Sequence, residues 1–132
     1  MEPIETVRHY VGRINAGDTA GLASLVTEDH RFVDAEGTAH PRGLTRDGWA
    51  GYFELFPDYQ IDVEVIFANG DTVAAFGYAS GSFQGKGAEK AGGAWRFPAA
   101  WKAVVREGKV LEWRVYADVE PMMRSMGMRR FE

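Results

Sequence analysis

The sequence contains no cysteine, so disulfide bonds, thiolate metal sites and a cysteine nucleophile are all excluded. It has no basic run longer than Arg129-Arg130, and its 19 acidic residues outnumber the 15 basic ones to give a net charge of −4. Proteins that bind nucleic acid present a basic face, so nucleic acid is not expected as a partner. No stretch of about eighteen apolar residues occurs, and the N-terminal segment carries glutamates where a signal peptide would carry lysines. We therefore expect no membrane span, and the cytoplasm is the default location.

Histidine is scarce as well, and its three copies stand at positions 9, 30 and 40. No two of them are four residues apart and no cysteine accompanies them, so the spacing of a zinc site is missing. We interpret all three as surface or capping residues. The Gly-x-Ser-x-Gly elbow of hydrolases and the glycine-rich fingerprint of nucleotide-binding helices are also missing. We therefore expect neither a metal ion nor a cofactor.

What the chain does contain fits one globular domain over residues 1–132, since 45% of its residues are hydrophobic and 26% are charged. Near the N-terminus, apolar residues recur every three or four positions, which predicts an amphipathic helix over residues 3–16. Gly17 ends this helix, and a second, short helix is expected over residues 18–26. The aromatic-rich segment before a Pro-Asp pair predicts a third helix over residues 45–56.

The second half of the chain has the pattern of an antiparallel meander. Asn69-Gly70 is a strong signal for a two-residue hairpin, and Arg106 to Gly108 form a second tight turn. Glycine and proline predict loops over residues 37–43 and 85–94. Strands are expected over residues 61–68, 72–83, 95–105 and 109–119. Helices followed by antiparallel strands predict an α+β fold in which the helices cover one face of the sheet.

The segment FVDAEG at residues 32–37 places a carboxylate, Asp34, in a run that otherwise favours a short strand over residues 30–35. A buried carboxylate without partners would have a raised pKa, as a general base working near neutral pH requires. Alternatively, Asp34 is a strand-end residue that binds the amides of the following turn. Alternation along the strand places His30 and Phe32 on the same face, so His30 is a possible neighbour at a pocket mouth or at the solvent rim.

Four segments occur in a characteristic order: YVGRINAGDTAGLASLV, FVDAEG, the Gly108-Lys109 hairpin and EWRVYAD. Together they cover nearly the whole chain, and the chain resembles the NTF2-like superfamily, in particular its SnoaL-like and ketosteroid-isomerase-like members. The resemblance implies an α+β cone, in which a curved, mostly antiparallel sheet wraps around three N-terminal helices as in a cystatin-like roll. It also implies a deep apolar pocket between sheet and helices, and a homodimer.

The same resemblance implies roles for individual residues. Tyr10 matches the tyrosine that donates a hydrogen bond to the substrate oxyanion in the isomerases, and Asp34 matches their catalytic base. A second, protonated carboxylic acid completes the oxyanion hole in that family. Counted back from Gly108, its position here is Ala100, so this acid is missing. One oxyanion donor is typically worth about a hundred- to a thousand-fold in rate, so efficient steroid isomerisation is not expected.

The closing segment WRVYAD resembles the last strand of SnoaL-like cyclases and of limonene-epoxide-hydrolase-like proteins, where the final aspartate is an acid or base. Asp118 is the matching residue. Alternation places Asp118 on the face of Arg114 and opposite that of Trp113, so it is alternatively an outer-surface partner of Arg114. The Arg-x-Asp pair of the epoxide hydrolases has no counterpart in FGYASGSF, so epoxide opening is the weaker alternative.

Aromatic side chains are abundant enough to line an apolar cavity, although core packing alone also explains many of them. Tyr10 itself lies on the apolar stripe of the first helix and is alternatively a core tyrosine whose hydroxyl finds another partner. The methionines of the C-terminal tail could plug the cone or contact a partner subunit. The candidate ligand-binding residues are Trp49, Phe53, Phe56, Trp101, Trp113, Tyr116 and His30.

We therefore expect a site for an apolar carbonyl compound, in which Asp34 removes a proton next to the carbonyl and Tyr10 stabilises the enolate. Isomerisation or aldol-type ring closure would follow, as in an isomerase or a polyketide-cyclase-like lyase. The alternative is a non-catalytic ligand-binding or dimerisation module of the same fold, which the missing acid at Ala100 favours. An epoxide hydrolase is a further alternative.

Overall fold

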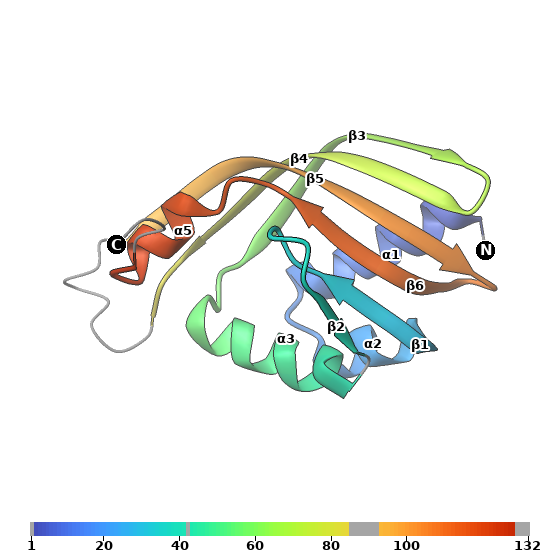
Figure 1. Ribbon diagram of the computed structural model, residues 1–132, viewed down its shortest axis with the longest axis horizontal. Helices are drawn as coiled ribbons and strands as arrows, with labels where there is room; N and C mark the ends of the chain where they lie inside the picture. Colours follow the sequence, from blue (N-terminus) through green and yellow to red (C-terminus); the bar gives the residue numbers. More distant parts are fainter. Residues whose placement is uncertain (1, 42, 85–92, 129–132) are drawn as a thin grey trace.

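The computed structural model describes residues 2–41, 43–84 and 93–128 (Figure 1). The helices are α1 (Pro3–Asn15), α2 (Thr19–Ser24), α3 (Gly43–Leu55) and the short C-terminal α5 (Glu120–Ser125). The strands are β1 (Val26–Val33), β2 (Ala39–Pro41), β3 (Gln60–Asn69), β4 (Thr72–Ser82), β5 (Ala94–Arg106) and β6 (Lys109–Tyr116). None of the helices in this described part is long and apolar enough to cross a membrane.

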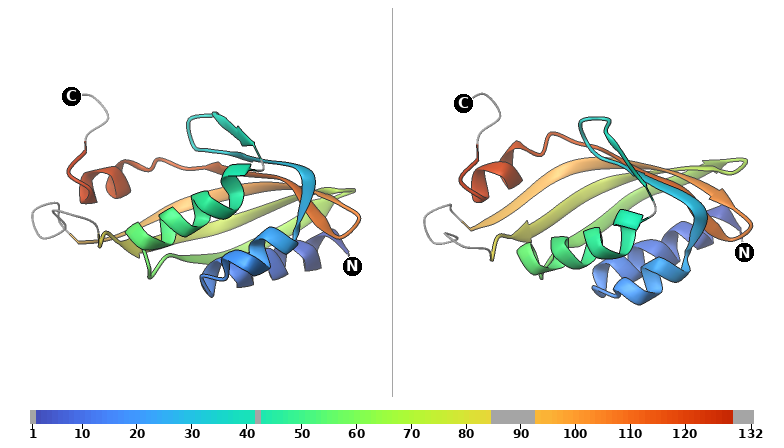
Figure 2. Two further views of the ribbon diagram at one scale, coloured as in Figure 1. Left: turned by 90° about the horizontal axis from the view of Figure 1, so that it is seen from below. Right: turned by 60° about the horizontal axis from the view of Figure 1, so that its bottom comes forward.

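The strands of the described residues form one curved sheet in the order β2-β1-β6-β5-β4-β3. Strands β1 and β6 run parallel, and the other neighbouring pairs are antiparallel. Helices α1, α2 and α3 lie against one face of this sheet, which Figure 2 shows from two sides. The predicted α+β cone with three N-terminal helices is therefore confirmed.

The N-terminal helices follow from local signals in the sequence. Helix α1 buries the apolar stripe that includes Val7, Tyr10 and Ile14. Gly17 ends the helical segment at a φ of 64°, a conformation that suits glycine. The Asp18 side chain then accepts the backbone N–H of Gly21 at 2.9 Å, an N-cap bond typically worth about 1 kcal/mol. At the end of α1, the Asn15 side chain donates to the carbonyl oxygen of Ile61 on β3 at 2.9 Å and accepts the N–H of the same residue at 2.8 Å, which fixes α1 against the sheet.

A β-bulge bends the sheet over the helices. The register between β3 and β4 shifts between Val63 and Val65, opposite Gly77. A Cβ atom at Gly77 would overlap the carbonyl oxygen of Asp62, so only glycine permits this close approach of the two backbones. The bend turns the inner face of the sheet into a concave wall.

Alternate residues of the strands fill the core on this concave side. On β5 the inward residues are all apolar, and they are Trp95, Phe97, Ala99, Trp101, Ala103 and Val105. Fully burying one large apolar side chain typically contributes about 1.5–3 kcal/mol, so this face fixes which side of β5 faces the helices.

Several predicted boundaries differ from the structure. The strand predicted over residues 30–35 is β1, which begins and ends earlier, so Asp34 stands just beyond its end. The predicted loop over residues 37–43 contains β2, which pairs with β1 in a hairpin. Helix α5 was also not predicted, and it lies where the sequence analysis expects only a methionine-containing tail. The loop expected at 85–94 falls mainly on residues 85–92, outside the described residues.

Candidate functional site

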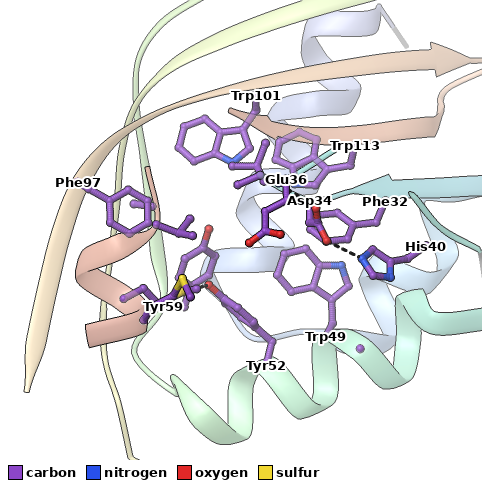
Figure 3. A pocket seen from close by; sticks show the side chains of 17 residues that line it. Phe32, Asp34, Glu36, His40, Trp49, Tyr52, Tyr59, Phe97, Trp101 and Trp113 are labelled. Atoms are coloured by element: carbon purple, nitrogen blue, oxygen red, sulfur yellow. Dashed lines mark hydrogen bonds and ion pairs between the residues drawn. The ribbon is translucent and has the colours of Figure 1, made fainter. Parts of the chain in front are cut away.

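A cavity of about 450 Å³ opens between the inner face of the sheet and helices α3 and α5 (Figure 3). Small-molecule sites commonly have volumes of about 300–1,000 Å³, so the cavity has the size of a ligand pocket. Most of its wall is apolar or aromatic. The lining residues are Phe32, Asp34, Ala35, Glu36, His40, Gly48, Trp49, Tyr52, Tyr59, Ala79, Phe97, Trp101, Trp113, Val115, Val119, Met122 and Met123.

Aromatic rings from the sheet and from α3 face each other across this pocket. Trp101 of β5 and Trp113 of β6 stack with ring centroids 6.4 Å apart and form the sheet side. On the helix side, Trp49 meets Tyr52 edge-on at 5.9 Å, and Tyr52 meets Tyr59 edge-on at 4.9 Å. The structure thus places the predicted Trp49, Trp101 and Trp113 in the lining. Because the rings contact one another, the pocket is pre-formed.

Asp34 lies at the mouth of the pocket, in the turn between β1 and β2. Its Oδ1 accepts the backbone N–H groups of Glu36 and Thr38, each at 3.0 Å. Its Oδ2 lies 2.9 Å from Nε2 of His40, which the dashed line in Figure 3 marks. The hairpin between β1 and β2 places His40 opposite Phe32, and their rings stack at 5.6 Å. Asp34 is therefore both a turn-binding carboxylate and a pocket residue.

These partners decide the protonation state of the pair. Burial raises the pKa of Asp34, but hydrogen bonds from His40 and from the Thr38 and Glu36 amides outweigh it, so the net pKa is lowered. Of the two alternatives that the sequence left open for Asp34, the lowered pKa fits the carboxylate that binds the turn amides and not the carboxylate without partners. An ionised carboxylate only accepts hydrogen bonds, so Nε2 of His40 must carry the proton that it donates. A neutral His40 then keeps a lone pair on Nδ1.

Glu36 contributes a second carboxylate two residues further along the turn. Figure 3 shows its side chain pointing into the cavity among the labelled aromatic rings. Within the described part of the chain, its carboxylate makes no hydrogen bond or ion pair. The two carboxylates of this turn therefore have different surroundings, because Asp34 accepts three hydrogen bonds and Glu36 accepts none from described residues.

Tyr10 lies one layer behind the pocket wall. Its side chain is fully buried, and its ring packs against Trp113 with centroids 5.0 Å apart. Its hydroxyl accepts a hydrogen bond from Nε1 of Trp49 at 3.4 Å. Tyr10 itself does not belong to the lining, whereas Trp49 does. Burial raises the pKa of Tyr10 well above its ordinary value of 10.0, more than the Trp49 bond lowers it. The structure thus gives Tyr10 a core position, from which it holds a lining tryptophan.

Two phenols that do line the pocket are Tyr52 and Tyr59. Figure 3 shows the Tyr59 hydroxyl pointing into the cavity. Burial raises the pKa of Tyr59, and its hydrogen bond with Tyr52 only partly opposes this effect. Tyr52 donates a hydrogen bond to the sulfur of Met122 at 3.2 Å, which ties α3 to α5. Both phenols stay protonated at neutral pH. Tyr52 has a single O–H, which it donates to Met122, so Tyr59 is the phenol that can donate to a ligand oxygen.

Four of the residues predicted to bind the ligand do not belong to the lining of this cavity. Phe53 stacks on Trp49 at 5.4 Å, and Phe56 packs in the core against Trp95 at 5.3 Å. His30 is buried, and its Nδ1 lies 2.8 Å from the carbonyl oxygen of Val110. Tyr116 is 47% exposed on the outer face, with the guanidinium of Arg114 4.9 Å above its ring.

Asp118 and Ala100 do not belong to the lining of the cavity either. Asp118 is exposed and accepts the backbone N–H of Glu120 at 3.1 Å, at the start of α5. Ala100 sits on the outer face of β5, because the inward residues on either side of it are Ala99 and Trp101. Counting back from the hairpin therefore selected the wrong face. The second carboxylic acid of the isomerases is nevertheless missing, since the inward residues of β5 include no carboxylic acid.

His40, Glu36 and Tyr59 are site residues that the sequence did not indicate. His40 was interpreted as a surface histidine because β2 was not predicted. A hairpin signal was present, since Asp34 and Gly37 suit a tight turn that returns the chain beside β1. Among the described residues, no cluster of histidine and acidic side chains could hold a metal ion.

Comparisons with known proteins agree on one family. A model of the SnoaL-like domain matches residues 7–113. Among curated proteins, none matches the chain. A protein with a ketosteroid isomerase-like fold from Catenulispora acidiphila, solved in complex with trimethylamine, has 17% identity and a TM-score of 0.79, and the match covers 94% of this chain and 93% of that chain.

Two Streptomyces structures are similar as well. IdmH from S. antibioticus, proposed to be a polyketide cyclase, has 24% identity and a TM-score of 0.75, with 97% of this chain and 100% of its own covered. AclR from S. galilaeus, proposed to be a hydroxylase, has 20% identity and a TM-score of 0.79, with 95% and 80% covered. At these identities the likeness establishes the fold and not the chemistry.

Proposed function

The chain belongs to the SnoaL-like domain family, and we propose that its aromatic pocket carries out acid–base chemistry on an apolar carbonyl compound. The observation that carries this proposal is the 2.9 Å contact between Asp34 and Nε2 of His40 at the pocket wall. In this arrangement the ionised Asp34 orients His40 and holds the lone pair on Nδ1. A carboxylate paired with a histidine in this way is a common design for a base that works near neutral pH.

The proposed reaction begins with removal of a proton from the carbon next to the carbonyl. Nδ1 of His40 takes the proton, and the electrons of the broken C–H bond form an enolate. In an isomerisation, the proton returns from His40 to another carbon of the ligand. In a ring closure, the enolate carbon attacks a second carbonyl, a C–C bond forms, and the new alkoxide takes up the proton.

Tyr59 is our proposed hydrogen-bond donor to the enolate oxygen. Its hydroxyl belongs to the pocket lining, whereas the hydroxyl of Tyr10 lies behind Trp49. Burial keeps Tyr59 protonated, so it can donate throughout the reaction. Tyr10 then acts as a positioning residue, because it fixes the indole ring that forms one wall.

A non-catalytic module of the same fold is the second candidate function. The missing acid on the inward face of β5 favours it, since the oxyanion would have one donor fewer than in the isomerases. The cavity and the Asp34–His40 pair favour an enzyme, because a module that only dimerises needs neither an open cone nor a hydrogen-bonded aspartate–histidine pair at its mouth.

The test is exchange of α-protons for deuterium, because every proposed reaction begins with this step. The probe is 2-tetralone, an apolar ketone small enough for the cavity, and exchange is followed by NMR in D₂O. We expect wild-type protein to accelerate exchange over buffer, and His40→Gln and Asp34→Asn to lose the acceleration. The matched control His9→Gln changes an exposed histidine on α1 and should exchange at the wild-type rate.

Wild-type protein that binds the ketone but exchanges its protons no faster than buffer would contradict the enzymatic proposal. Binding is measured separately by quenching of tryptophan fluorescence, since three of the chain's four tryptophans line the pocket. Binding without exchange would favour the non-catalytic module.

We also propose a homodimer that forms through the outer face of the sheet. Val65, Phe76, Ala100 and Tyr116 stand opposite one another on four adjacent strands. Val65 is 50% exposed and Phe76 is 43% exposed, and Phe67 stacks beside Phe76 at 5.8 Å. A row of exposed apolar side chains on one face is typical of an interface between protein chains.

A further inference from the structure

Glu36 is the carboxylate of the pocket lining that the proposed proton transfer does not use. It points into a cavity with mostly apolar walls, and its carboxylate has no partner among the described residues. Glu36 is an exposed residue whose carboxylate faces aromatic rings, so a positively charged group between them would be attracted by both the carboxylate and the rings. The turn fixes its place, because the backbone N–H of Glu36 is bonded to Asp34 at 3.0 Å.

The charges around the cavity favour a cation. Among the described lining residues there are two carboxylates, one histidine and no lysine or arginine. Even with His40 protonated, these groups sum to one negative charge. Arg114 lies beside the turn at Gly37, but its guanidinium lies over the ring of Tyr116 and does not belong to the lining. An anionic ligand would therefore meet repulsion at the mouth.

The walls favour a cation for a second, independent reason. Seven of the described lining residues are aromatic, and the faces of indole and phenol rings attract ammonium groups within about 6 Å of their centroids. Trp49, Tyr52 and Tyr59 form one connected group of rings on the helix side. Trp101 and Trp113 form a stacked pair on the sheet side.

We propose that the pocket prefers apolar ligands that carry a protonated amine or a quaternary ammonium group, with Glu36 and the aromatic rings as the cation-binding residues. This inference rests on the proposed function only in taking the cavity as a ligand site. It adds the charge of the ligand, which the proposed proton transfer leaves open. The volume of about 450 Å³ accommodates an apolar body together with such a head group.

The experiment compares two ligands of the same shape that differ in charge. Benzyltrimethylammonium is the cation, and neopentylbenzene is its neutral carbon isostere. Binding to the full chain is measured by quenching of tryptophan fluorescence at low ionic strength. We expect the cation to bind about ten-fold more tightly than its isostere, and added salt to weaken only the cation.

A pair of charge variants locates the effect. Glu36→Gln should weaken binding of the cation by about two- to five-fold, because it removes the facing carboxylate. The affinity for neopentylbenzene should stay unchanged in the same variant, which shows that the pocket is intact. The matched control Glu64→Gln removes an exposed carboxylate from β3, away from the lining, and should change neither affinity.

Each other outcome overturns the inference. Equal binding of the two ligands to wild-type protein would refute the preference for cations, while the deuterium-exchange assay still decides the proposed function separately. An equal loss in Glu36→Gln and Glu64→Gln would show that only the net charge of the protein matters. Failure of the cation to bind at all would refute the cation site.

Discussion

The substitution Asp34→Asn keeps the shape of the side chain at the pocket mouth and removes its charge. The oxygen of the new amide can still accept the backbone N–H groups of Glu36 and Thr38, which lie 3.0 Å from Oδ1 in the wild-type turn. The atom that faces Nε2 of His40, 2.9 Å away, becomes an amide nitrogen, which only donates. His40 must then accept at Nε2 and carry its proton on Nδ1. The substitution therefore removes the lone pair that the proposed reaction uses.

Activity should fall far more than stability in this variant. A histidine base held in the wrong tautomer typically loses about 10⁴-fold in rate, so we expect a drop of about 10³- to 10⁴-fold in deuterium exchange. Two of the three hydrogen bonds to residue 34 remain, so the free energy of unfolding should fall by less than about 1 kcal/mol. Asp34→Ala loses all three, and we expect it to cost about 1–3 kcal/mol, since the aspartate side chain is 33% exposed.

Three measurements check this reasoning. The ¹⁵N chemical shifts of the His40 ring report which nitrogen carries the proton, urea unfolding gives the stability, and NMR gives the exchange rate. Wild-type protein should show the Nε2–H tautomer, and Asp34→Asn the Nδ1–H tautomer. The reasoning is refuted if the variant exchanges at the wild-type rate, or if its His40 keeps the Nε2–H tautomer.

Three further predictions concern the scaffold. Phe76→Lys should convert a dimer into a monomer in analytical ultracentrifugation, because it places a charge in the exposed apolar row; an unchanged mass would exclude this face. Burial raises the pKa of Glu112, but its bonds to Lys102 and Arg31 lower the pKa by more, so the net pKa in the folded state is below the unfolded value. The ionised Glu112 therefore stabilises the fold fully above its unfolded pKa, and this stabilisation is lost as the pH falls through the folded pKa. Urea unfolding of Glu112→Gln should therefore depend less on pH below about pH 5 than wild type. Gly77→Ala should cost about 1–3 kcal/mol or more, because its Cβ would overlap the backbone of Asp62, whereas Gly51→Ala in α3 meets nothing within 4 Å and should stabilise by about 0.5–1 kcal/mol.

The elements that could be predicted from the sequence depend on short-range signals. Helix α1 follows from the spacing of its apolar residues, and the β3–β4 hairpin follows from Asn69-Gly70, where Gly70 adopts a φ of 61°. The parallel pairing of β1 with β6 joins segments about eighty residues apart, as in the register of Phe32 with Trp113. No local pattern indicates such a pairing, so the place of FVDAEG beside the last strand could not be predicted from the sequence.

The candidate site was predicted in part for the same reason. The large rings Trp101 and Trp113 were identified because alternation within one strand gives their face. Ala100 was assigned by counting from the hairpin, and alternation from Trp101 would have placed it outside. Tyr59 follows directly after the Pro-Asp pair that ends α3, so its segment was interpreted only as a helix terminator. Hydrogen-bond partners such as His40 depend on tertiary structure and could not be derived.

Two carboxylates of one turn should respond to different perturbations, because their partners differ. The Asp34 charge is held by two amides and His40, whereas the Glu36 charge faces the aromatic cavity. Asp34→Asn should therefore shift the tautomer of His40 in the ¹⁵N spectrum, and Glu36→Gln should leave that tautomer as in wild type. Conversely, the preference for benzyltrimethylammonium over neopentylbenzene should fall in Glu36→Gln. A tautomer shift in Glu36→Gln would mean that the two carboxylates act as one electrostatic unit, and that proton transfer and ligand charge recognition cannot be assigned to separate residues.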